Sequence, residues 1–228
     1  MKRNKIIKIS AISFAVIVAI IALVILLPRS NTNGDNNTSL SIGNSPVLGN
    51  PDAPVTIYEF SDFSCPYCQA AEGKNAQVIS MLKSKSPDWE APMPLIKEQY
   101  VDTGKVKIVF KYYPGHGAAN AAHAVALGLN EQNPELFWEF AEKAFAQAAN
   151  LDDLNKMKAI AIGLGADEKA LSDYLDSKKY EAQLEEDIKM ADNNTVQGTP
   201  TFFINGNKVE GAQSFAVFED MIEKELGK

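Results

Sequence analysis

The sequence is poor in cysteine and histidine, with two of each in 228 residues. This excludes a framework of several disulfides and leaves few ligands for a metal ion. Zinc at Cys65 and Cys68 requires two further ligands, and His116 and His123 lie outside zinc-finger spacing. Covalent haem is disfavoured because Gln69, not histidine, follows Cys68. We therefore expect no metal and no other cofactor.

An excess of basic residues is also lacking. The chain has 22 Lys and Arg against 29 Asp and Glu, and five of the basic residues lie at or before Arg29. Residues 30–228 therefore hold 17 basic and 29 acidic residues, a net charge of −12. Nucleic acid and anionic membrane surfaces repel such a charge, so we expect no nucleic-acid partner.

One long hydrophobic run is present, from Ile9 to Leu27, and its nineteen residues carry no charge. At 1.5 Å per residue a helix of this length spans about 29 Å, close to the hydrocarbon thickness of a bilayer. A cleaved signal peptide is the alternative, but its apolar region is typically about 7–15 residues long and ends at a small-residue site. This run ends in Leu-Leu-Pro-Arg. We favour an uncleaved transmembrane helix over 9–27.

The charges around this helix predict its orientation. Four basic residues lie in segment 1–8, against Arg29 alone after the helix, which places the N-terminus in the cytoplasm. The rest of the chain is then anchored on the outer side of the cell membrane, where disulfides are permitted. Segment 28–45 is rich in Asn, Ser, Thr and Gly and predicts a flexible linker. One domain, 46–228, follows.

Both cysteines stand in one tetrapeptide, Cys65-Pro66-Tyr67-Cys68, behind a strand-like run. A disulfide that closes so short a loop restrains the unfolded chain little, so we expect this pair to react. If Pro66 begins a helix, Cys65 is its N-cap and faces unpaired backbone N–H groups. These groups and the helix dipole can lower a cysteine pKa from about 8.5 into the range of roughly 3.5–7.5. We expect Cys65 to be the exposed attacking sulfur and Cys68, facing the core, to be its resolving partner.

The hydrophobic pattern predicts a mixed sheet with flanking helices. Strands are predicted at Val55–Phe60, Val106–Tyr112, Thr201–Ile204 and Lys208–Glu210, with Asn205-Gly206 as a hairpin turn. The first two flank a helix and should run parallel, whereas the last two are antiparallel. Later helices are predicted at Ala118–Leu129, from Asn133-Pro134 through Phe145, and at Leu151–Ile162, Glu168–Leu175, Lys179–Met190 and Ser214–Leu226. Most of them form a predicted helical insertion at about 116–192, and proline-interrupted Lys74–Pro94 predicts an extended surface insertion.

The tetrapeptide, the helical insertion and the late run Val196–Gly206, with Gly-Thr-Pro at 198–200, together resemble the DsbA-like branch of the thioredoxin-fold thiol-disulfide oxidoreductases. The resemblance covers nearly all of 46–228 and implies a thioredoxin-like α/β fold with an inserted helical subdomain. It implies that Pro200 is cis and faces the cysteines, and that the backbone of Thr199 pairs with a substrate peptide.

The resemblance also assigns roles around the cysteines. It matches Glu59 to a buried acid beneath the pair, whose pKa rises if no cation is near, so that it can take a proton from Cys68. The alternative is a glutamate exposed on an edge strand. Pro66 and Tyr67 are expected to tune the redox potential through the Cys65 thiolate.

Other polar and aromatic residues carry weaker expectations. Asp62 is predicted to be a solvated loop residue, and His116 and His123 to be surface or structural. Trp138 is expected in the core with its phenylalanine neighbours Phe137, Phe140 and Phe145. An apolar groove for unfolded clients is expected beneath the helical insertion.

The resulting interpretation is an enzyme that introduces disulfides into reduced exported proteins through a mixed disulfide at Cys65. Because the sequence has no third cysteine, its electrons must pass to another protein, expected from the family to be a membrane quinone-linked thiol oxidase. Two alternatives stay open. One is a membrane-anchored reductase or isomerase, and the other is a peptide-binding chaperone with an idle disulfide.

Overall fold

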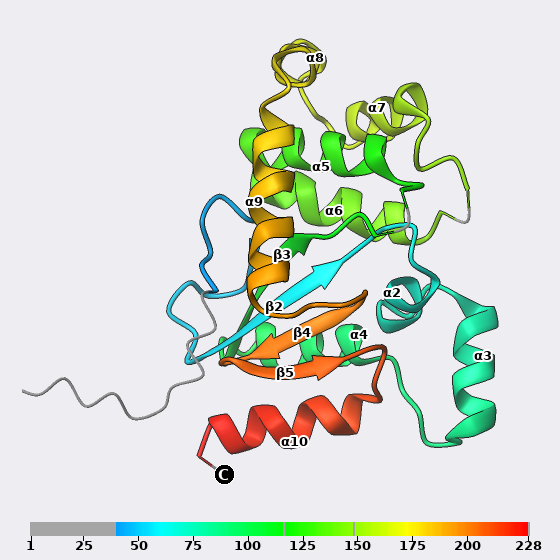
Figure 1. Cartoon of the computed structure of the whole chain (residues 1–228), viewed down its shortest axis with the longest axis vertical. Coiled ribbons are helices and arrows are strands. Elements are labelled where there is room, and N and C mark those ends of the chain that lie inside the picture. The colour runs from blue at the N-terminus through cyan, green and yellow to red at the C-terminus, as the bar shows by residue number, and fades with distance from the viewer. Residues whose placement is uncertain (1–39, 116, 148, 228) are drawn as a thin grey trace, which may run out of the picture. The chain divides into compact units, whose positions relative to one another are not determined.

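A five-stranded mixed sheet lies at the centre of the part of the chain described by the computed structural model, residues 40–115, 117–147 and 149–227 (Figure 1). Its strand order is β1-β3-β2-β4-β5. The strands are β1 (Val47–Leu48), β2 (Val55–Ser61), β3 (Val106–Tyr112), β4 (Thr201–Ile204) and β5 (Asn207–Glu210). β2 and β3 are parallel, and the other neighbouring pairs are antiparallel, as the sequence predicts for β2–β3 and β4–β5.

The hairpin turn between β4 and β5 also agrees with prediction. Asn205 and Gly206 have φ angles of 45° and 89°, in the left-handed region that asparagine and glycine tolerate best. The register places Glu59 of β2 between Phe110 of β3 and Phe202 of β4. β2 is therefore the central strand, and the alternative of an edge-strand position for Glu59 is wrong.

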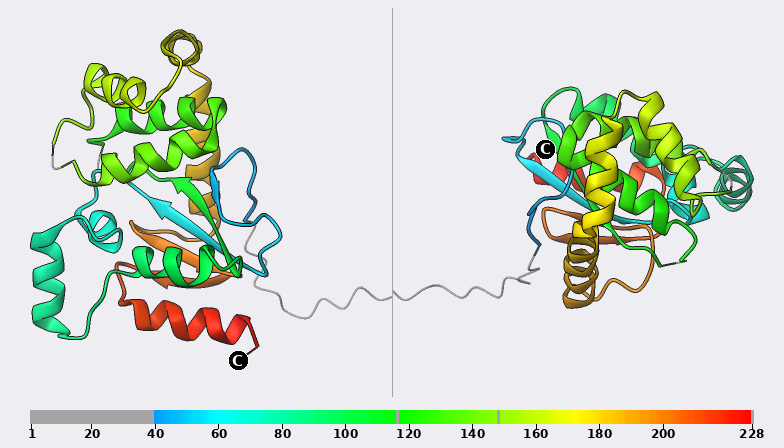
Figure 2. Two further views of the ribbon diagram at one scale, coloured as in Figure 1. Left: turned by 180° about the vertical axis from the view of Figure 1, so that it is seen from behind. Right: turned by 90° about the horizontal axis from the view of Figure 1, so that it is seen from above.

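Helices surround the sheet and also extend beyond it (Figures 1 and 2). Those outside the connection from β3 to β4 are α2 (Pro66–Ala71), α3 (Ala76–Lys85), α4 (Pro92–Ile96), the π-helix η1 (Lys97–Val101) and α10 (Phe215–Glu225). Between β3 and β4 come α5 (Asn120–Gln132), α6 (Pro134–Phe145), α7 (Leu154–Gly163), α8 (Glu168–Ser177) and α9 (Lys179–Asn193). The N-cap of α6 is Asn133, whose side chain accepts from the Glu135 N–H, as the Asn-Pro pair predicts.

Three apolar clusters hold these layers together. On one face of the sheet, α2, α4 and α10 pack on residues such as Ile57 and Ile204. On the other face, Met190 and Ala191 of α9 pack with Phe60. The third cluster joins the end of β3 to the helical insertion through aromatic side chains, namely Phe63, Phe110, Tyr112, Phe137, Phe140 and Phe145, with Trp138 partly buried beside them. Each fully buried phenylalanine contributes about 1.5–3 kcal/mol, so this cluster fixes the insertion against the sheet.

Segment 74–94 is helical for much of its length, so the expectation of an extended insertion is wrong. The Asn75 side chain caps α3 by accepting from the Val78 N–H. No residue of α3 is buried, which places the helix at the surface. The following turn is anchored by Trp89, which is buried and donates from Nε1 to the Ala212 carbonyl at 3.0 Å.

The end of the predicted linker belongs to the folded domain. Ser45 is buried, and its hydroxyl accepts from the Lys111 ammonium at 2.7 Å, so a flexible linker does not extend to residue 45. The predicted transmembrane helix over 9–27 lies outside the described residues. Within the described ranges, no helix is long and apolar enough to cross a membrane.

Candidate active site

Cys65 occupies the N-cap of α2, as predicted from the proline that follows it. Its backbone is extended, with φ −75° and ψ 119°, and Pro66 is the first helical residue. The Cys65 N–H donates to the Asp62 carbonyl at 3.0 Å, and the Cys65 carbonyl accepts from the Gln69 N–H at 3.0 Å. The cysteine is thus held between the end of β2 and the first turn of α2, where helical N–H groups lack helical partners.

The Cys65 side chain is not exposed, contrary to expectation. The residue is 1% exposed, because its thiol lies against the loop before β4 and donates to the Thr199 carbonyl at 3.3 Å. Pro66 and Tyr67 are the exposed residues of the tetrapeptide, and Tyr67 is 43% exposed. A partner sulfur must therefore approach Cys65 along the edge formed by Tyr67 and Thr199.

The loop before β4 is fixed by hydrogen bonds on both sides of a cis Thr199–Pro200 peptide bond. The Thr201 hydroxyl donates to the Gly198 carbonyl at 2.7 Å, and the Pro200 carbonyl accepts from the Gly211 N–H at 2.8 Å. Pro200 is buried and Thr199 is partly exposed. The structure therefore brings Thr199, which precedes Pro200, to Cys65, although 134 residues separate Thr199 from the cysteine.

Cys68 lies completely buried one turn after Cys65, and the pair is in its dithiol form. Burial raises the pKa of the Cys68 thiol well above its ordinary value, and the hydrogen bond and charge of Cys65 raise it further. The Ser61 hydroxyl and the Asp62 backbone act in the opposite direction but do not cancel the rise. Cys68 thus keeps its proton at neutral pH, and its attack on a disulfide requires a proton acceptor.

Glu59 is a buried carboxyl group on the same strand as Ser61, two residues away. Burial and then the charge of Glu72 raise its pKa from 4.5 to about 8. The rise occurs although a cation is near, since Lys97 and Ser61 lower the pKa in part. Neither carboxyl oxygen has a hydrogen-bond partner within the described part of the chain. Ser61 lowers the pKa of both Glu59 and Cys68 in part, so both groups share its surroundings.

Two further charged residues lie near Glu59 and form an ion pair. Glu72 Oε2 and Lys97 Nζ are 2.7 Å apart. Burial lowers the pKa of Lys97, but the charge and hydrogen bond of Glu72 outweigh it and the net pKa is raised. Lys97 therefore stays charged near Glu59. Sequence reasoning missed both residues, and the only available signal for Glu72 was a charge directly after a short apolar helix.

Gln69 connects the active helix to its neighbours and was also missed. Its amide donates to the Phe63 carbonyl at 2.9 Å and to the Gln147 carbonyl at 3.3 Å, and its oxygen accepts from Asn75 at 3.0 Å. These bonds join α2 to the segment after α6 and to the cap of α3. The signal in the sequence was a polar side chain within the small apolar helix.

The prediction that Asp62 is a solvated loop residue is wrong. Of the two alternatives for His123, surface or structural, the structure supports the second. Both side chains are fully buried, and His123 Nε2 lies 3.4 Å from Asp62 Oδ1. Burial acts to raise the pKa of Asp62, but His123 and Ser64 outweigh it and lower the pKa to about 2. His123 is a structural residue of the core, whereas His116 lies outside the described residues.

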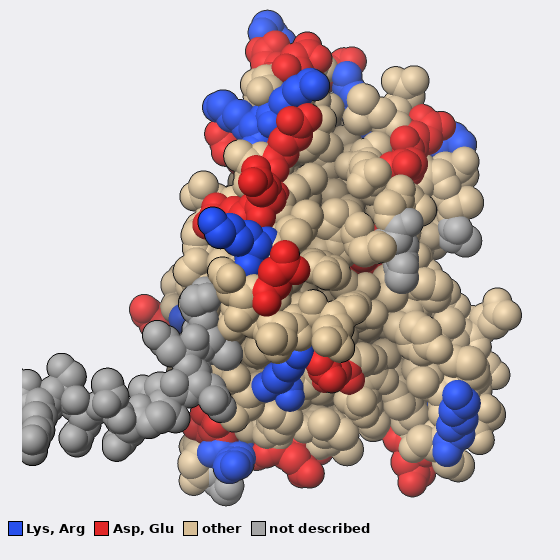
Figure 3. Space-filling view, in the orientation of Figure 1, with Lys and Arg blue, Asp and Glu red and all other residues tan. Residues whose placement is uncertain are grey.

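A groove of about 570 Å³ borders Thr199 and Tyr67. Most of its lining comes from the α3 region and from the segment between β5 and α10. The lining residues are Tyr67, Leu82, Lys85, Ser86, Trp89, Thr199, Gly211, Ala212, Gln213, Ser214 and Val217. The prediction that the helical insertion supplies the groove is therefore wrong for this cavity. On the face in Figure 3, charged side chains gather along α8 and α9, and the surface over α2 is largely uncharged.

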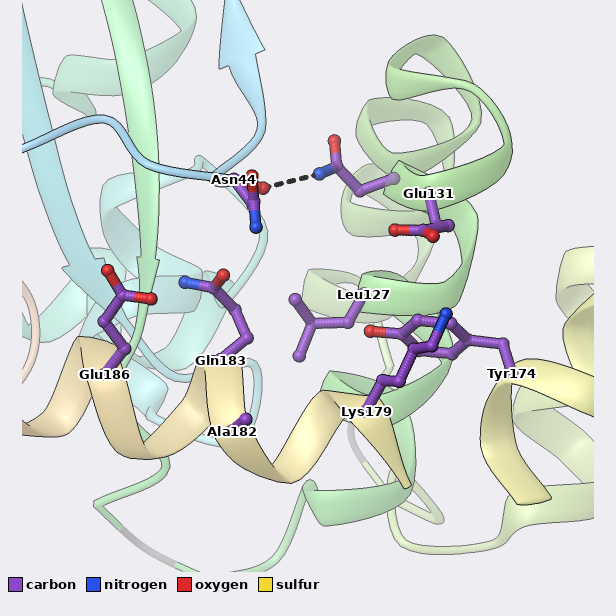
Figure 4. Close-up of a pocket in the computed structure, with 9 residues that line it drawn as sticks. Asn44, Leu127, Glu131, Tyr174, Lys179, Ala182, Gln183 and Glu186 are labelled. Atoms are coloured by element: carbon purple, nitrogen blue, oxygen red, sulfur yellow. Dashed lines mark hydrogen bonds between the residues drawn. The ribbon is translucent and has the colours of Figure 1, made fainter. Parts of the chain in front are cut away.

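A second cavity, of about 200 Å³, lies between α5, α8, α9 and Asn44 (Figure 4). The Asn130 amide donates across it to the Asn44 carbonyl at 2.9 Å, and Glu131, Lys179 and Tyr174 line the same space. None of the predicted site residues contributes to this cavity. Among the described residues, no group of His, Cys, Asp and Glu side chains is arranged to hold a metal ion.

Comparison with known proteins places this site in a family. Residues 41–83 and 88–224 match the family model described as thioredoxin. The disulfide bond formation protein D of Bacillus subtilis is 28% identical over 196 residues, covering 82% of this chain and 79% of that protein. The chain belongs to the DsbA-like branch of the thioredoxin family. It is accordingly a thiol-disulfide oxidoreductase.

Solved structures agree with the fold of this DsbA-like protein. Oxidised BdbD from Bacillus subtilis superposes with a TM-score of 0.67 at 27% identity, covering 82% of this chain and 96% of that one. The α-DsbA1 of Wolbachia pipientis has a TM-score of 0.65 at 24% identity, covering 82% and 94%, and shares the fold. The mixed sheet and helical insertion of this DsbA-like protein are thus shared with both.

Proposed function

We propose that this DsbA-like protein is a dithiol oxidase that introduces disulfides into exported proteins. The observation that carries the proposal is the 3.3 Å approach of the Cys65 thiol, at the N-cap of α2, to the Thr199 carbonyl. This arrangement places the N-cap cysteine of the pair beside a backbone edge where an extended peptide can pair. The sulfur that reacts and the backbone that holds its partner are therefore adjacent.

The exchange proceeds in two steps that conserve sulfur bonds and electrons. A substrate thiolate attacks Sγ of Cys65 in the oxidised pair, the Cys65–Cys68 bond breaks, and Cys68 leaves as a thiolate. A second substrate thiolate then attacks the substrate sulfur of the mixed disulfide, and Cys65 leaves as a thiolate. The substrate has lost two electrons to form its disulfide, and the enzyme has gained them as a dithiol.

Glu59 is the proposed proton donor and acceptor for Cys68. The Cys68 thiolate formed in the first step lies in an environment that raises its pKa, so it takes up a proton. Glu59, with a pKa of about 8, is protonated at neutral pH and can supply that proton. In reoxidation the direction reverses, and Glu59 accepts the proton from Cys68 as that thiol attacks. Pro66 and Tyr67 tune the potential by setting the surroundings of Cys65.

The substrate segment is proposed to lie along Thr199 and in the adjoining groove. Backbone pairing at Thr199 gives affinity without regard to sequence, as expected for an enzyme that acts on many unfolded chains. The groove supplies apolar contacts from Leu82, Trp89 and Val217. The partners are thus reduced exported proteins.

Reoxidation requires a second partner. Because the sequence has no third cysteine, we propose that the dithiol passes its two electrons to a membrane quinone-linked thiol oxidase. The helix predicted over 9–27 would hold the domain on the outer side of the cell membrane as a single-pass anchor, within reach of such a partner.

The reduction potential of the full chain in detergent tests the direction of electron flow. Equilibration in glutathione buffers, with the thiolate absorbance of Cys65 followed against pH, gives both quantities needed. A potential near about −120 mV with Cys65 ionised well below pH 7 supports the oxidase, because its reduced form is then stabilised. A potential near about −270 mV overturns the proposal in favour of the reductase or isomerase. Full client-folding activity in Cys65→Ser would instead support the chaperone.

A further inference from the structure

Behind Cys65 lies a buried pair, Asp62 and His123, that the exchange steps do not use. Asp62 Oδ1 accepts from the Ser64 N–H at 2.8 Å and from the Ser64 hydroxyl at 2.7 Å, and lies 3.4 Å from His123 Nε2. The Asp62 carbonyl accepts from the Cys65 N–H at 3.0 Å. One aspartate therefore holds both residues that lead into the active helix.

His123 is positioned from α5, 61 residues away in sequence. Its ring stacks on Phe63 with centroids 4.7 Å apart, and the Tyr112 ring meets it edge-on at 5.7 Å. Nδ1 is buried and has no hydrogen-bond partner among the residues described. Burying a polar atom without a partner is unfavourable, and an apolar side chain would fill this space without that cost. The histidine is therefore explained by its other nitrogen, which faces Asp62.

The charge of Asp62 links its contact with His123 to the ionisation of the cysteine thiols. The pKa of Asp62 is lowered to about 2, so the group is a carboxylate at neutral pH and Nε2 of His123 carries the proton between them. A carboxylate near a thiol opposes ionisation of that thiol. Asp62 lies three residues before Cys65, and its carbonyl accepts from the Cys65 N–H at 3.0 Å, so its carboxylate belongs to the turn that carries this cysteine. His123 Nε2, 3.4 Å from Oδ1, is a donor to the carboxylate that partly offsets this effect.

We propose that Asp62 and His123 form a positioning pair for Cys65. Asp62 holds the turn that places the thiol at the N-cap, and His123 offsets the field of the Asp62 carboxylate at the cysteines. The pair thereby sets part of the balance between the dithiol and disulfide forms. The inference rests on exchange at Cys65–Cys68, and it does not depend on the direction of electron flow.

Two substitutions are expected to move the glutathione equilibrium in opposite directions. Asp62→Asn keeps an oxygen that accepts from Ser64 but removes the charge, so the Cys65 thiolate is stabilised and the dithiol form favoured. His123→Phe keeps the stacking on Phe63 but removes the donor, so the carboxylate acts on the thiols in full and the disulfide form is favoured. Each change should alter the equilibrium constant by about threefold to tenfold, as expected for nearby charges with partial screening.

Rescue and coupling separate this role from a merely structural one. His123→Gln retains an amide donor and should return the equilibrium constant toward that of the wild type. In the Asp62→Asn background, His123→Phe should have little further effect, because no carboxylate remains to be offset. Asp173→Asn, which removes an exposed carboxylate of α8, is the control and should leave the constant unchanged.

The equilibrium constants are measured on the full chain in detergent, with thermal unfolding of each variant as a check on folding. Shifts of Asp62→Asn and His123→Phe in the same direction, or additive shifts in the double variant, overturn the proposal. If His123→Phe does not fold, Asp62→Asn alone decides, since no change or a shift toward the disulfide overturns it. The absolute potential of the wild type tests the oxidase proposal, whereas differences between variants test this pair.

Discussion

Glu59 couples its proton to folding, because a carboxyl group enclosed by the central strands keeps that proton to a higher pH than in the unfolded chain. Its pKa rises from 4.5 to about 8. The stabilisation from the bound proton is complete below about pH 4.5 and is lost as the pH rises through 8, since the unfolded chain ionises first. Each pKa unit corresponds to about 1.4 kcal/mol, so the effect is on the order of 5 kcal/mol.

Glu59→Gln should remove this dependence, since glutamine keeps the shape but does not titrate. We expect the free energy of unfolding of the wild type to fall relative to that of the variant between pH 5 and about 8.5. Urea unfolding at several pH values measures it. Glu185→Gln, on the exposed side of α9, is the matched control and should follow the wild type. Parallel curves for Glu59→Gln and the wild type would show that Glu59 is not the titrating group.

The two single-cysteine variants should differ in how much mixed disulfide they accumulate. Cys68→Ser leaves Cys65 at the N-cap but removes the thiol that resolves its mixed disulfide. We therefore expect a stable adduct on Cys65 after incubation with a reduced client and oxidised glutathione, detected by mass spectrometry. Cys65→Ser should form far less adduct, because Cys68 is buried and its pKa is raised. Equal labelling of Cys68 in that variant would contradict the assignment of Cys65 as the attacking sulfur.

At the scale of elements, β3 and α9 are joined by a buried ion pair between Lys111 and Asp187, 3.2 Å apart. The same ammonium donates to the Ile42 carbonyl at 3.2 Å and to Ser45, so it also holds the start of the domain. Lys111→Met leaves Asp187 buried without its cation and should lower the free energy of unfolding by about 3–5 kcal/mol. Chemical denaturation measures the loss.

Lys169→Met is the control for that prediction. It breaks the exposed Lys169–Asp173 pair of α8, which has about the same chemistry but lies in water. We expect little change in the free energy of unfolding, because solvent screens exposed pairs. Losses of similar size in both variants would show that burial of the Lys111 pair adds nothing to stability.

Elements whose cause is local were predictable from the sequence. The Asn205-Gly206 turn, the Asn133 cap and the Cys65 cap each depend on a few neighbouring residues, and the structure confirms all three. β1 was missed because its two residues, Val47 and Leu48, become a strand only through pairing with β3. Local signals therefore placed most strands and helices but could not supply their distant partners.

Features of the site that depend on distant segments could not be predicted in the same way. The burial of Cys65 arises from Thr199, and the burial of Asp62 from His123 on α5. No pattern near either residue records these approaches. The family resemblance indicated Glu59 and Pro200, but it carried no information on Asp62 or on the charge of Lys97 beside Glu59.

At the scale of the whole molecule, the groove beside the cysteines is assembled from segments far apart in sequence. Leu82 and Trp89 come from the α3 region, Thr199 from the loop before β4, and Val217 from the start of α10. Trp89 joins two of these segments through its bond to Ala212. An extended client can contact the groove while its thiol reacts at Cys65, whereas a small thiol can react without this contact. The groove can therefore favour the client without changing the chemistry at Cys65.

Val217→Ser should therefore weaken reaction with a peptide dithiol but not with glutathione. Val217 is 40% exposed in the groove, and removing one such apolar contact costs about 1 kcal/mol, or about fivefold in kcat/KM. Stopped-flow kinetics with both thiols measures the two rates. Ile188→Ser is the matched control, since Ile188 is a similarly exposed apolar residue, at 37%, outside the groove. An equal loss with glutathione, or the same loss in Ile188→Ser, would mean that the groove does not bind the peptide.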